Sequence, residues 1–374
     1  MQYPTISYLT KVQFGAGSIA DLPEVIQRVG MQRPLVVTDT GLLARGFVER
    51  LKLSKPVVFS DIETNPTEAS VLRGVEAFRV AACDGIIALG GGSPMDAAKG
   101  IGILATHNLA LEDAAFICGG LEKITSAVTP IIAIPTTSGT GSEVGRGALI
   151  SMSSGRKLAI ISPYIIPKWS IVDPELTLEL PPLLTAATGM DALSHCLETY
   201  CSNVFNPVAG AIAIDGLRRG WANIKSVVAD GQNIAARSEM MMCAMQGALS
   251  FQKGLGVIHA VSHPLGALRH KELHHGTLNA VFMPHAIRFN FDSAREKMET
   301  ISTTLGISSG SDALADAFSD LNHEIGLPKK LSEMGVEPDD LMGVAEDALL
   351  DHCGLTNPRT LTFENLKVFL KSAL

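Results

Sequence analysis

The chain has 374 residues, of which 46% are hydrophobic and 18% charged, and its formal net charge at pH 7 is -8. This composition excludes a disordered chain, and the lack of any lysine or arginine run argues against a nucleic-acid partner. No window reaches about 18 uninterrupted apolar residues, so we expect no membrane span. The opening residues lack the basic and apolar regions of a secretion signal, and the six cysteines form no CxxC pair. We therefore expect a cytoplasmic protein with reduced thiols.

Short apolar runs alternate with segments of helical period in the first half of the chain. The strand-like runs are residues 34–38, 85–89 and 130–134, and the helix-like segments between them are 68–82 and 93–105. This alternation is typical of βαβ units, which form a parallel sheet with helices on both faces. Residues 144–172 predict further strands around the turn at 152–155, which would complete the domain.

The strand-like runs stop after Pro181 and Pro182, and long helix-period segments continue to the C-terminus. We therefore predict an α/β nucleotide-binding domain with a parallel sheet at residues 1–180. An all-α metal-binding domain is predicted at residues 181–374. The high hydrophobic content indicates that the helices are covered by the other domain or by another copy of the chain.

A glycine-rich turn, GGGSPMD at residues 90–96, follows the second predicted strand. Glycines let a backbone approach a ligand closely, Ser93 is a suitable N-cap, and Pro94 suits the first helical position. The N–H groups at that helix end would hold a pyrophosphate. A purely structural tight turn is the alternative interpretation.

A second loop, PTTSGTGSE at residues 135–143, occupies the same position after the next strand. Two such loops at the carboxyl ends of neighbouring strands mark the ligand crevice of an open α/β sheet, and a dinucleotide fits that geometry. Asp39 follows the first strand, where its carboxylate can accept hydrogen bonds from an adenosine ribose. Its charge would repel a 2′-phosphate, which favours NAD over NADP. The alternative is a simple turn residue.

One aspartate and several histidines in the second half have the spacing of a metal site. Asp191 and His195, and likewise His259 and His263, are spaced i, i+4, so in helices each pair shares one face. His275 follows shortly after. Carboxylate and imidazole ligands suit iron(II), zinc, nickel or manganese, and the absence of cysteine argues against a structural zinc site. We interpret the site as catalytic.

These motifs, in this order, resemble the iron-dependent, or group III, alcohol dehydrogenases. The matching segments run from FGAGSIADL through GGGSPMDAAK, IPTTSGTGSEV, ATGMDALSHCLE and GVIHAVSHPLG to HHGTLNAVFMPH. The resemblance implies a nucleotide-binding domain of the dehydroquinate synthase type and a helical metal domain. It also implies a homodimer or larger assembly, with the strand around Ile6 to Phe14 exchanged or paired between subunits.

The resemblance also implies roles for single residues. The implied ligands of Fe2+ or Zn2+ are Asp191, His195, His259 and His275, where His275 is preferred to His274 because a glycine follows it. His263 matches a histidine beside the metal that is a candidate for proton transfer. The implied cofactor residues are Asp39 at the ribose, Gly91, Gly92 and Ser93 at the pyrophosphate, Thr136, Thr137 and Thr140 along the phosphate and nicotinamide, and Lys157 near the cofactor.

The implied reaction passes hydride between a primary alcohol and the nicotinamide, with the metal as a Lewis acid. Arg146 and Lys253 stand where the family places its substrate pocket, and the planar fork of an arginine recognises carboxylate. FQKGLG and LHHGTLNA also resemble the 4-hydroxybutyrate dehydrogenase branch, so we predict an ω-hydroxy acid such as 4-hydroxybutyrate. An ion pair between Arg146 and Glu143 is the structural alternative. The alternative substrates are neutral short-chain alcohols or diols, and the remote alternative is a lyase of the dehydroquinate synthase type.

Overall fold

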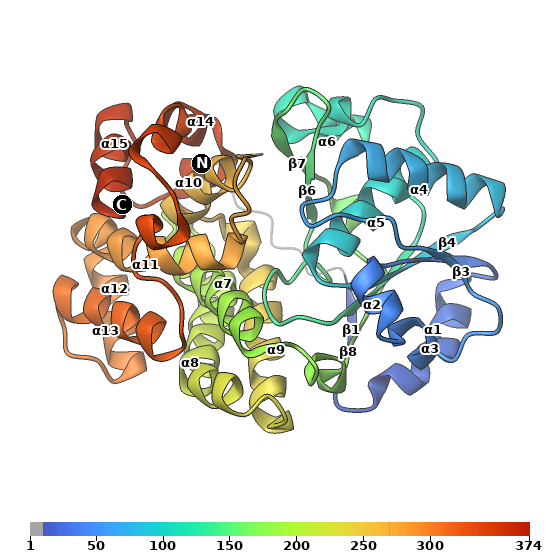
Figure 1. Cartoon of the computed structure of the whole chain (residues 1–374), viewed down its shortest axis with the longest axis horizontal. Helices are drawn as coiled ribbons and strands as arrows, with labels where there is room; N and C mark the ends of the chain where they lie inside the picture. The colour runs from blue at the N-terminus through green and yellow to red at the C-terminus, as the bar shows by residue number, and fades with distance from the viewer. Residues whose placement is uncertain (1–9, 269) are drawn as a thin grey trace. The chain divides into compact units, whose positions relative to one another are not determined.

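The computed structural model describes residues 10–268 and 270–374, which form two compact units (Figure 1). The α/β unit comprises residues 10–137 and Gly141–Thr177. The helical unit comprises Ser138–Thr140 and Leu178–Leu374. The assignment of nucleotide binding to residues 1–180 and of metal binding to 181–374 stays a prediction.

A six-stranded sheet, with every pair of neighbours parallel, forms the centre of the α/β unit. Its strands, in spatial order, are β1 (Lys11–Phe14), β8 (Trp169–Val172), β5 (Ile131–Pro135), β4 (Gly85–Gly90), β2 (Pro34–Val37) and β3 (Val57–Phe59). Every residue of β4 and β5 is buried. Ile86 packs into the core on one face of the sheet and Ile87 into the core on the other. The predicted parallel α/β architecture is thereby confirmed, since helices cover both faces.

The helices of the α/β unit follow the predicted pattern with one difference at the glycine-rich turn. They are α1 (Leu22–Val29), α2 (Thr40–Ala44), α3 (Phe47–Arg50), α4 (Glu68–Val80), α5 (Gly92–Leu104) and α6 (Gly120–Lys123). Helix α5 is capped by Gly91 instead of Ser93 and therefore begins before the predicted position. The reason is local, because Gly90 has a φ of 148°, which turns the chain out of β4 at once.

The strands predicted within residues 144–172 form a separate antiparallel pair and a member of the main sheet. β6 (Gly147–Ser151) and β7 (Lys157–Ile161) pair with each other around the predicted turn. β8 joins the main sheet between β1 and β5.

The described part of the helical unit contains helices and no strands. Its helices are α7 (Pro182–Cys201), α8 (Pro207–Ala229), α9 (Ile234–Leu249), α10 (Val257–Leu265), α11 (His275–Asn290), α12 (Arg295–Leu305), α13 (Ser311–Glu324), α14 (Val344–Leu350) and α15 (Phe363–Ser372). Pro182 occupies the first position of α7, where its missing N–H costs nothing. Helix α7 is buried along nearly its whole length and packs against α8, α9 and α11. It is therefore the central helix of this unit.

Three further predictions bear on the described residues. Among the helices between residues 10 and 374, leaving out residue 269, none combines the length and apolar character of a membrane span. All six cysteines are unpaired, and four of them are buried. The predicted subunit-exchanged strand lies partly outside the described residues, and its described part, Lys11–Phe14, pairs with β8 of the same chain.

Candidate metal centre and nucleotide site

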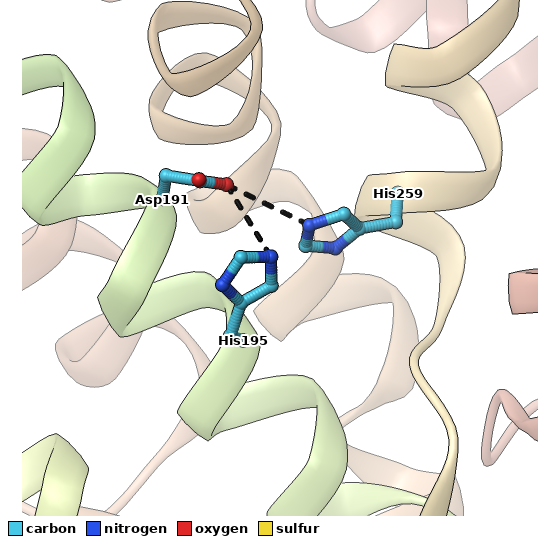
Figure 2. A group of neighbouring side chains, drawn as sticks. All are labelled: Asp191, His195 and His259. Atoms are coloured by element: carbon cyan, nitrogen blue, oxygen red, sulfur yellow. Dashed lines mark ion pairs between the residues drawn. The ribbon is translucent and has the colours of Figure 1, made fainter. Parts of the chain in front are cut away.

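Three predicted metal ligands meet inside the helical unit. Asp191 and His195 lie one turn apart on α7, and His259 reaches them from α10 (Figure 2). The Nε2 atoms of His195 and His259 lie 3.5 and 3.7 Å from Asp191 Oδ1. All three side chains are buried, and their ligand atoms lie within 4.8 Å of one another.

His275 completes this group from the first position of α11. Its Nε2 atom lies 3.6 Å from Asp191 Oδ1. His274, the alternative ligand, is the N-cap residue of the same helix, and its Nδ1 lies 3.5 Å from Thr277 Oγ1. The four side chains Asp191, His195, His259 and His275 are called the metal group below, and their role as ligands stays a prediction.

Asn279 marks the point toward which the metal group is directed. Its Nδ2 lies 2.7 Å from Asp191 Oδ1, 3.1 Å from His275 Nε2 and 3.3 Å from His259 Nε2. Its own Oδ1 is buried without a hydrogen-bond partner among the described residues. One carboxylate and three imidazoles that converge at a largely buried point form a donor set that fits a single divalent metal ion.

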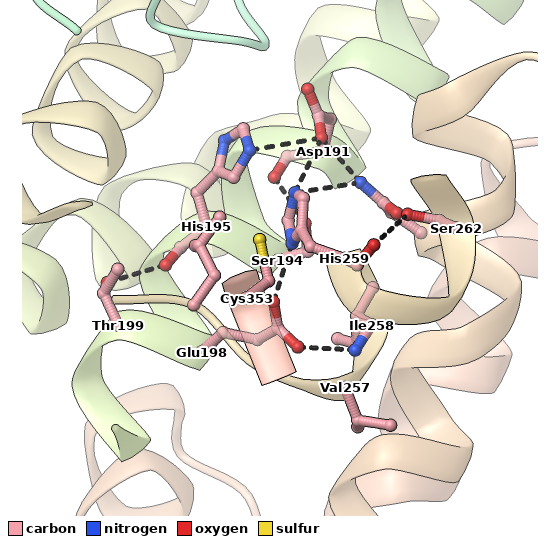
Figure 3. A network of polar contacts seen from close by, with 12 residues as sticks. Asp191, Ser194, His195, Glu198, Thr199, Val257, Ile258, His259, Ser262 and Cys353 are labelled. Carbon is pink, nitrogen blue, oxygen red and sulfur yellow. Dashed lines mark hydrogen bonds and ion pairs between the residues drawn. The ribbon is translucent and has the colours of Figure 1, made fainter. Parts of the chain in front are cut away.

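Glu198 supports the metal group, although the sequence analysis missed it. Its Oε2 accepts a hydrogen bond of 2.6 Å from His259 Nδ1, and its Oε1 accepts one of 2.6 Å from the Ile258 backbone N–H (Figure 3). With Nδ1 committed to Glu198, Nε2 is the atom of His259 that remains for a metal. The one available signal was its position, three residues after His195 on the same helix.

Protonation in the metal group follows from burial and from the nearby carboxylates. Burial lowers the pKa of His195 to about 4, so this imidazole is neutral at pH 7. Burial opposes ionisation of Asp191, but the imidazoles of His195, His259 and His275 hold its pKa well below the usual range. Burial also opposes the charged form of His259, yet Asp191 and Glu198 raise its pKa to about 9. A metal ion held by His259 Nε2 would therefore displace a proton from this imidazole.

His263 lies beside the metal group, one turn beyond His259 on α10. Its ring lies nearly parallel to that of His275, with an angle of 15° and 5.5 Å between the centroids. Its Nδ1 hydrogen-bonds to Asp351 Oδ2 at 2.8 Å. The structure thus brings the proposed proton-transfer residue next to the proposed ligands.

Three of the predicted nucleotide-binding segments follow three adjacent strands. Asp39 comes after β2, the glycine turn after β4, and Thr136 and Thr137 at and beyond the end of β5. The chain leaves β2 toward β3 and leaves β4 toward β5 on the other side, so the topological switch point lies between β2 and β4. A Cβ added at Gly91 would lie only 3.2 Å from Thr137 Oγ1, so the two loops are in contact. Thr140, by contrast, belongs to the helical unit.

Ser93 and Lys157 are joined by Asn65, a residue that the sequence analysis missed. The Asn65 backbone N–H donates to Ser93 Oγ at 3.3 Å, and Lys157 Nζ donates to Asn65 Oδ1 at 2.7 Å. Asn65 has a φ of 61°, a left-handed conformation that asparagine tolerates better than most residues. Asp39 has a structural bond as well, because its Oδ1 accepts from the Leu42 backbone N–H at 2.9 Å and caps α2.

A buried lysine shapes the loop that follows residue 140. Lys99 Nζ donates to four oxygens, Ser142 O at 2.8 Å, Ser142 Oγ at 2.7 Å, Gly145 O at 3.1 Å and Gly147 O at 2.7 Å. Asp96 accepts from Ser142 Oγ at 2.8 Å and from the Leu149 backbone N–H at 2.9 Å. Burial lowers the pKa of Lys99 to about 8. We call Lys99, Asp96 and Ser142 the loop cluster.

The two predicted substrate residues lie in different units. Arg146 is exposed in the α/β unit, and no residue in the described ranges forms an ion pair with it. Glu143, the alternative partner, is buried, and burial raises its pKa to about 7. Lys253 is buried in the helical unit, where its Nζ donates to Tyr200 O at 2.7 Å near the end of α7. Its substrate role stays a prediction, as does that of Arg146.

Comparison with known proteins gives a consistent family. Residues 10–174 match the model for iron-containing alcohol dehydrogenases, and residues 185–374 match that for the C-terminal part of the same family. The chain is 46% identical to 4-hydroxybutyrate dehydrogenase of Cupriavidus necator, over 99% of each chain. Among solved structures, 1,3-propanediol oxidoreductase superposes with a TM-score of 0.92 at 36% identity, covering 99% of this chain and 100% of that chain.

A second solved structure carries a bound nucleotide. Sulfoacetaldehyde reductase from Bifidobacterium kashiwanohense, solved in complex with NAD+, superposes with a TM-score of 0.90 at 27% identity and covers 100% of this chain and 99% of that chain. The family models together span most of the sequence. The chain therefore belongs to the iron-containing alcohol dehydrogenase family and is an oxidoreductase that acts on a CH–OH group.

Proposed function

We propose that this protein is a metal-dependent, NAD(H)-linked dehydrogenase that interconverts a primary alcohol and its aldehyde. The observation that carries the proposal is the convergence of the metal group, three members of which lie within 3.3 Å of the side-chain nitrogen of Asn279. A bound NAD+ in a relative that covers the whole chain supports the choice of cofactor. The donor set accepts Fe2+ or Zn2+, and we propose Fe2+ from the family.

When bound, the metal supplies Lewis acidity at the substrate oxygen and NAD+ accepts the hydride. Asp191, His195, His259 and His275 would hold the metal. Glu198 keeps the ring of His259 oriented through Nδ1. His263, whose ring lies 5.5 Å from that of His275, receives the hydroxyl proton.

The proposed nucleotide contacts follow from the strand ends. The free backbone N–H groups at the start of α5, around Gly91, Gly92 and Ser93, would donate to the pyrophosphate. Asp39 would accept from the ribose hydroxyls at the switch point and repel a 2′-phosphate. Thr136, Thr137 and Thr140 would line the phosphates and the nicotinamide. Lys157 would lie near the cofactor.

For the substrate we propose an ω-hydroxy acid, with 4-hydroxybutyrate as the specific case. The 46% identity to a 4-hydroxybutyrate dehydrogenase supports this choice. Arg146 supports it too, because its guanidinium has no carboxylate partner in the parts of the chain that are described. A hydrogen-bonded ion pair with a substrate carboxylate would contribute about 1.5–3 kcal/mol.

The test compares an acid and a neutral substrate of the same length. Iron-loaded protein, prepared without oxygen, is assayed for NADH formation with 4-hydroxybutyrate and with 1,4-butanediol. Arg146→Ala should lower kcat/KM for the acid roughly 10- to 100-fold and leave the diol unchanged. Arg156→Ala, in the exposed turn of the same hairpin, is the matched control. Equal losses with both substrates would reject the carboxylate contact and favour neutral diols.

We also propose a homodimer, since large apolar side chains are exposed on adjacent segments of the helical unit. Phe205 is 75% exposed and Leu355 is 74% exposed. A backbone hydrogen bond from Asn203 to Thr356 holds these two segments together. Light scattering coupled to size exclusion should give twice the chain mass, and a monomer would reject the proposal.

A further inference from the structure

Four neighbouring side chains restrict the imidazole ring of His263. The ring of His275 lies at 5.5 Å and that of His352 at 6.2 Å, each inclined by only 15° to the ring of His263. His259 approaches it edge-on at 5.8 Å. Asp351 Oδ2 takes the hydrogen bond of Nδ1 at 2.8 Å. This ring is therefore held in one orientation next to the metal group.

Asp351 is itself fixed by the fold. It follows α14 and is the N-cap of the short 3₁₀ helix His352–Thr356, both of which pack against α10. Its second oxygen, Oδ1, accepts a hydrogen bond of 2.8 Å from the Cys353 backbone N–H. Oδ1 also lies 3.6 Å from His352 Nδ1, so Oδ2 is the carboxylate oxygen that faces His263.

The proposed proton transfer assigns a role to His263 and none to Asp351. The His263–Asp351 pair is nevertheless largely buried. The side chains of His263 and Asp351 are 7% and 15% exposed, and they are 88 residues apart in sequence. A surface counterpart exists in His270 and Asp340, where the histidine side chain is 62% exposed. Burying a carboxylate is costly unless it is paired, so the His263 pair needs a reason that the surface pair does not.

We propose that Asp351 is a positioning residue that holds His263 with its proton on Nδ1 and thus presents Nε2 as the proton acceptor. An ionised carboxylate only accepts hydrogen bonds, so Nδ1 must be the donor. Burial opposes the charge of Asp351, but His263 and His352 keep its pKa well below the usual range, so the carboxylate is ionised at pH 7. The inference rests on the proposed role of His263 in proton transfer.

A double-mutant cycle tests whether Asp351 acts through His263. His263→Ala should lower kcat roughly 100-fold or more, which is the usual contribution of a general base. Asp351→Ala should lower kcat about tenfold with a smaller change in KM, and should have no further effect in the His263→Ala background. Asp351→Asn, which keeps an acceptor oxygen and the size, should restore part of the loss. It also serves if the alanine variant folds poorly.

Two further measurements separate positioning from general damage. Metal content of all variants should equal that of the unaltered protein. In zinc-loaded protein with isotope-labelled histidine, nitrogen NMR should show His263 with its proton on Nδ1, and Asp351→Ala should lose this preference. Asp340→Asn, which removes the charge of the surface pair, should change neither readout.

The possible failures are distinguishable. If His263→Ala retains full turnover, the proposed proton transfer is wrong and the inference falls with it. If His263→Ala is slow but Asp351→Ala is fully active, only the inference is overturned. A further loss from Asp351→Ala in the His263→Ala background would make Asp351 a structural residue and likewise overturn the inference.

Discussion

Two buried polar clusters, one in each unit, differ in how fully their polar atoms satisfy one another's hydrogen bonds. In the α/β unit, the loop cluster is complete, because the Lys99 ammonium donates to four oxygens and Asp96 accepts from two donors. In the helical unit, Asp191, His259 and His275 direct their polar atoms to the side-chain nitrogen of Asn279, whose own Oδ1 has no partner among the described residues. Each cluster takes two of its members from one helix, Asp96 and Lys99 from α5 and Asp191 and His195 from α7.

This difference distinguishes a buried polar cluster with a structural role from one that can bind a cation. Desolvating a polar group costs free energy, which internal hydrogen bonds offset. A cluster that satisfies itself needs nothing further and defines the conformation of a loop. A cluster whose donor atoms converge without satisfying one another needs a cation. Breaking each cluster in turn should therefore have different consequences.

The largest expected effect comes from Asp191→Ala, which removes the one carboxylate of the metal group. The variant should purify without stoichiometric metal, and kcat/KM should fall roughly a thousandfold or more, since a bound metal contributes several kcal/mol to the transition state. Added metal should raise the Tm of the unaltered protein and not that of the variant. Asp215→Ala, in a partly exposed ion pair on α8, is the control. A variant with full metal content would contradict the proposed ligand set.

The next effect in size is a loss of stability in Lys99→Met. The variant leaves buried carbonyl oxygens of residues 142, 145 and 147 without their donor, which should cost about 3 kcal/mol. Thermal and urea unfolding measure this loss, and added metal should not reverse it. Lys123→Met removes an exposed ion pair with Asp113 and should change stability by less than about 1 kcal/mol. If added metal restored the stability of Lys99→Met, the proposed difference between the loop cluster and the metal group would be wrong.

The smallest expected effect is that of Glu198→Gln, which leaves all four proposed ligands in place. A glutamine lacks the charge that orients His259, so metal affinity should weaken about 10- to 100-fold. Competition with a chelator of known affinity measures the dissociation constant. Glu239→Gln, at a surface ion pair with Arg219, controls for the loss of charge. An unchanged affinity would show that the packing of α10 alone orients His259.

The sequence predicted those parts of the fold that depend on local pattern. The strands β2, β4 and β5 are continuous apolar runs, and two of the proposed ligands, Asp191 and His195, are spaced by one helical turn, so both features could be found without contacts. The edge strand β3 is only three residues long and half-buried, and it gave no such signal. The predicted start of α5 at Ser93 was wrong, because the left-handed φ of Gly90 turns the chain at once and the helix is capped by Gly91.

The residues that the sequence did not reveal act through long-range contacts. Glu198 meets its partner His259 at a separation of 61 residues, and Asp351 meets His263 at 88. The hydrogen bond from Lys253 Nζ to the backbone oxygen of Tyr200 in α7 spans 53 residues and was likewise not predictable from the sequence. Which charges meet in a folded chain depends on packing between elements, and no periodicity within one element contains that information.

The three residues Ser138–Thr140 have a consequence for dissecting the protein. They leave the α/β unit, join the helical unit and return, so between residues 10 and 374 three peptide connections link the units instead of one linker. Gly139 lies so close to α7 that an added Cβ would come within 2.9 Å of Thr188 Cβ, one turn before Asp191. A fragment that begins at residue 178 would keep all four proposed ligands and lose this brace. The proposed metal centre therefore cannot be moved to another protein as residues 178–374 alone. Such a transfer would also need the segment Ser138–Thr140, which lies within the α/β half of the sequence.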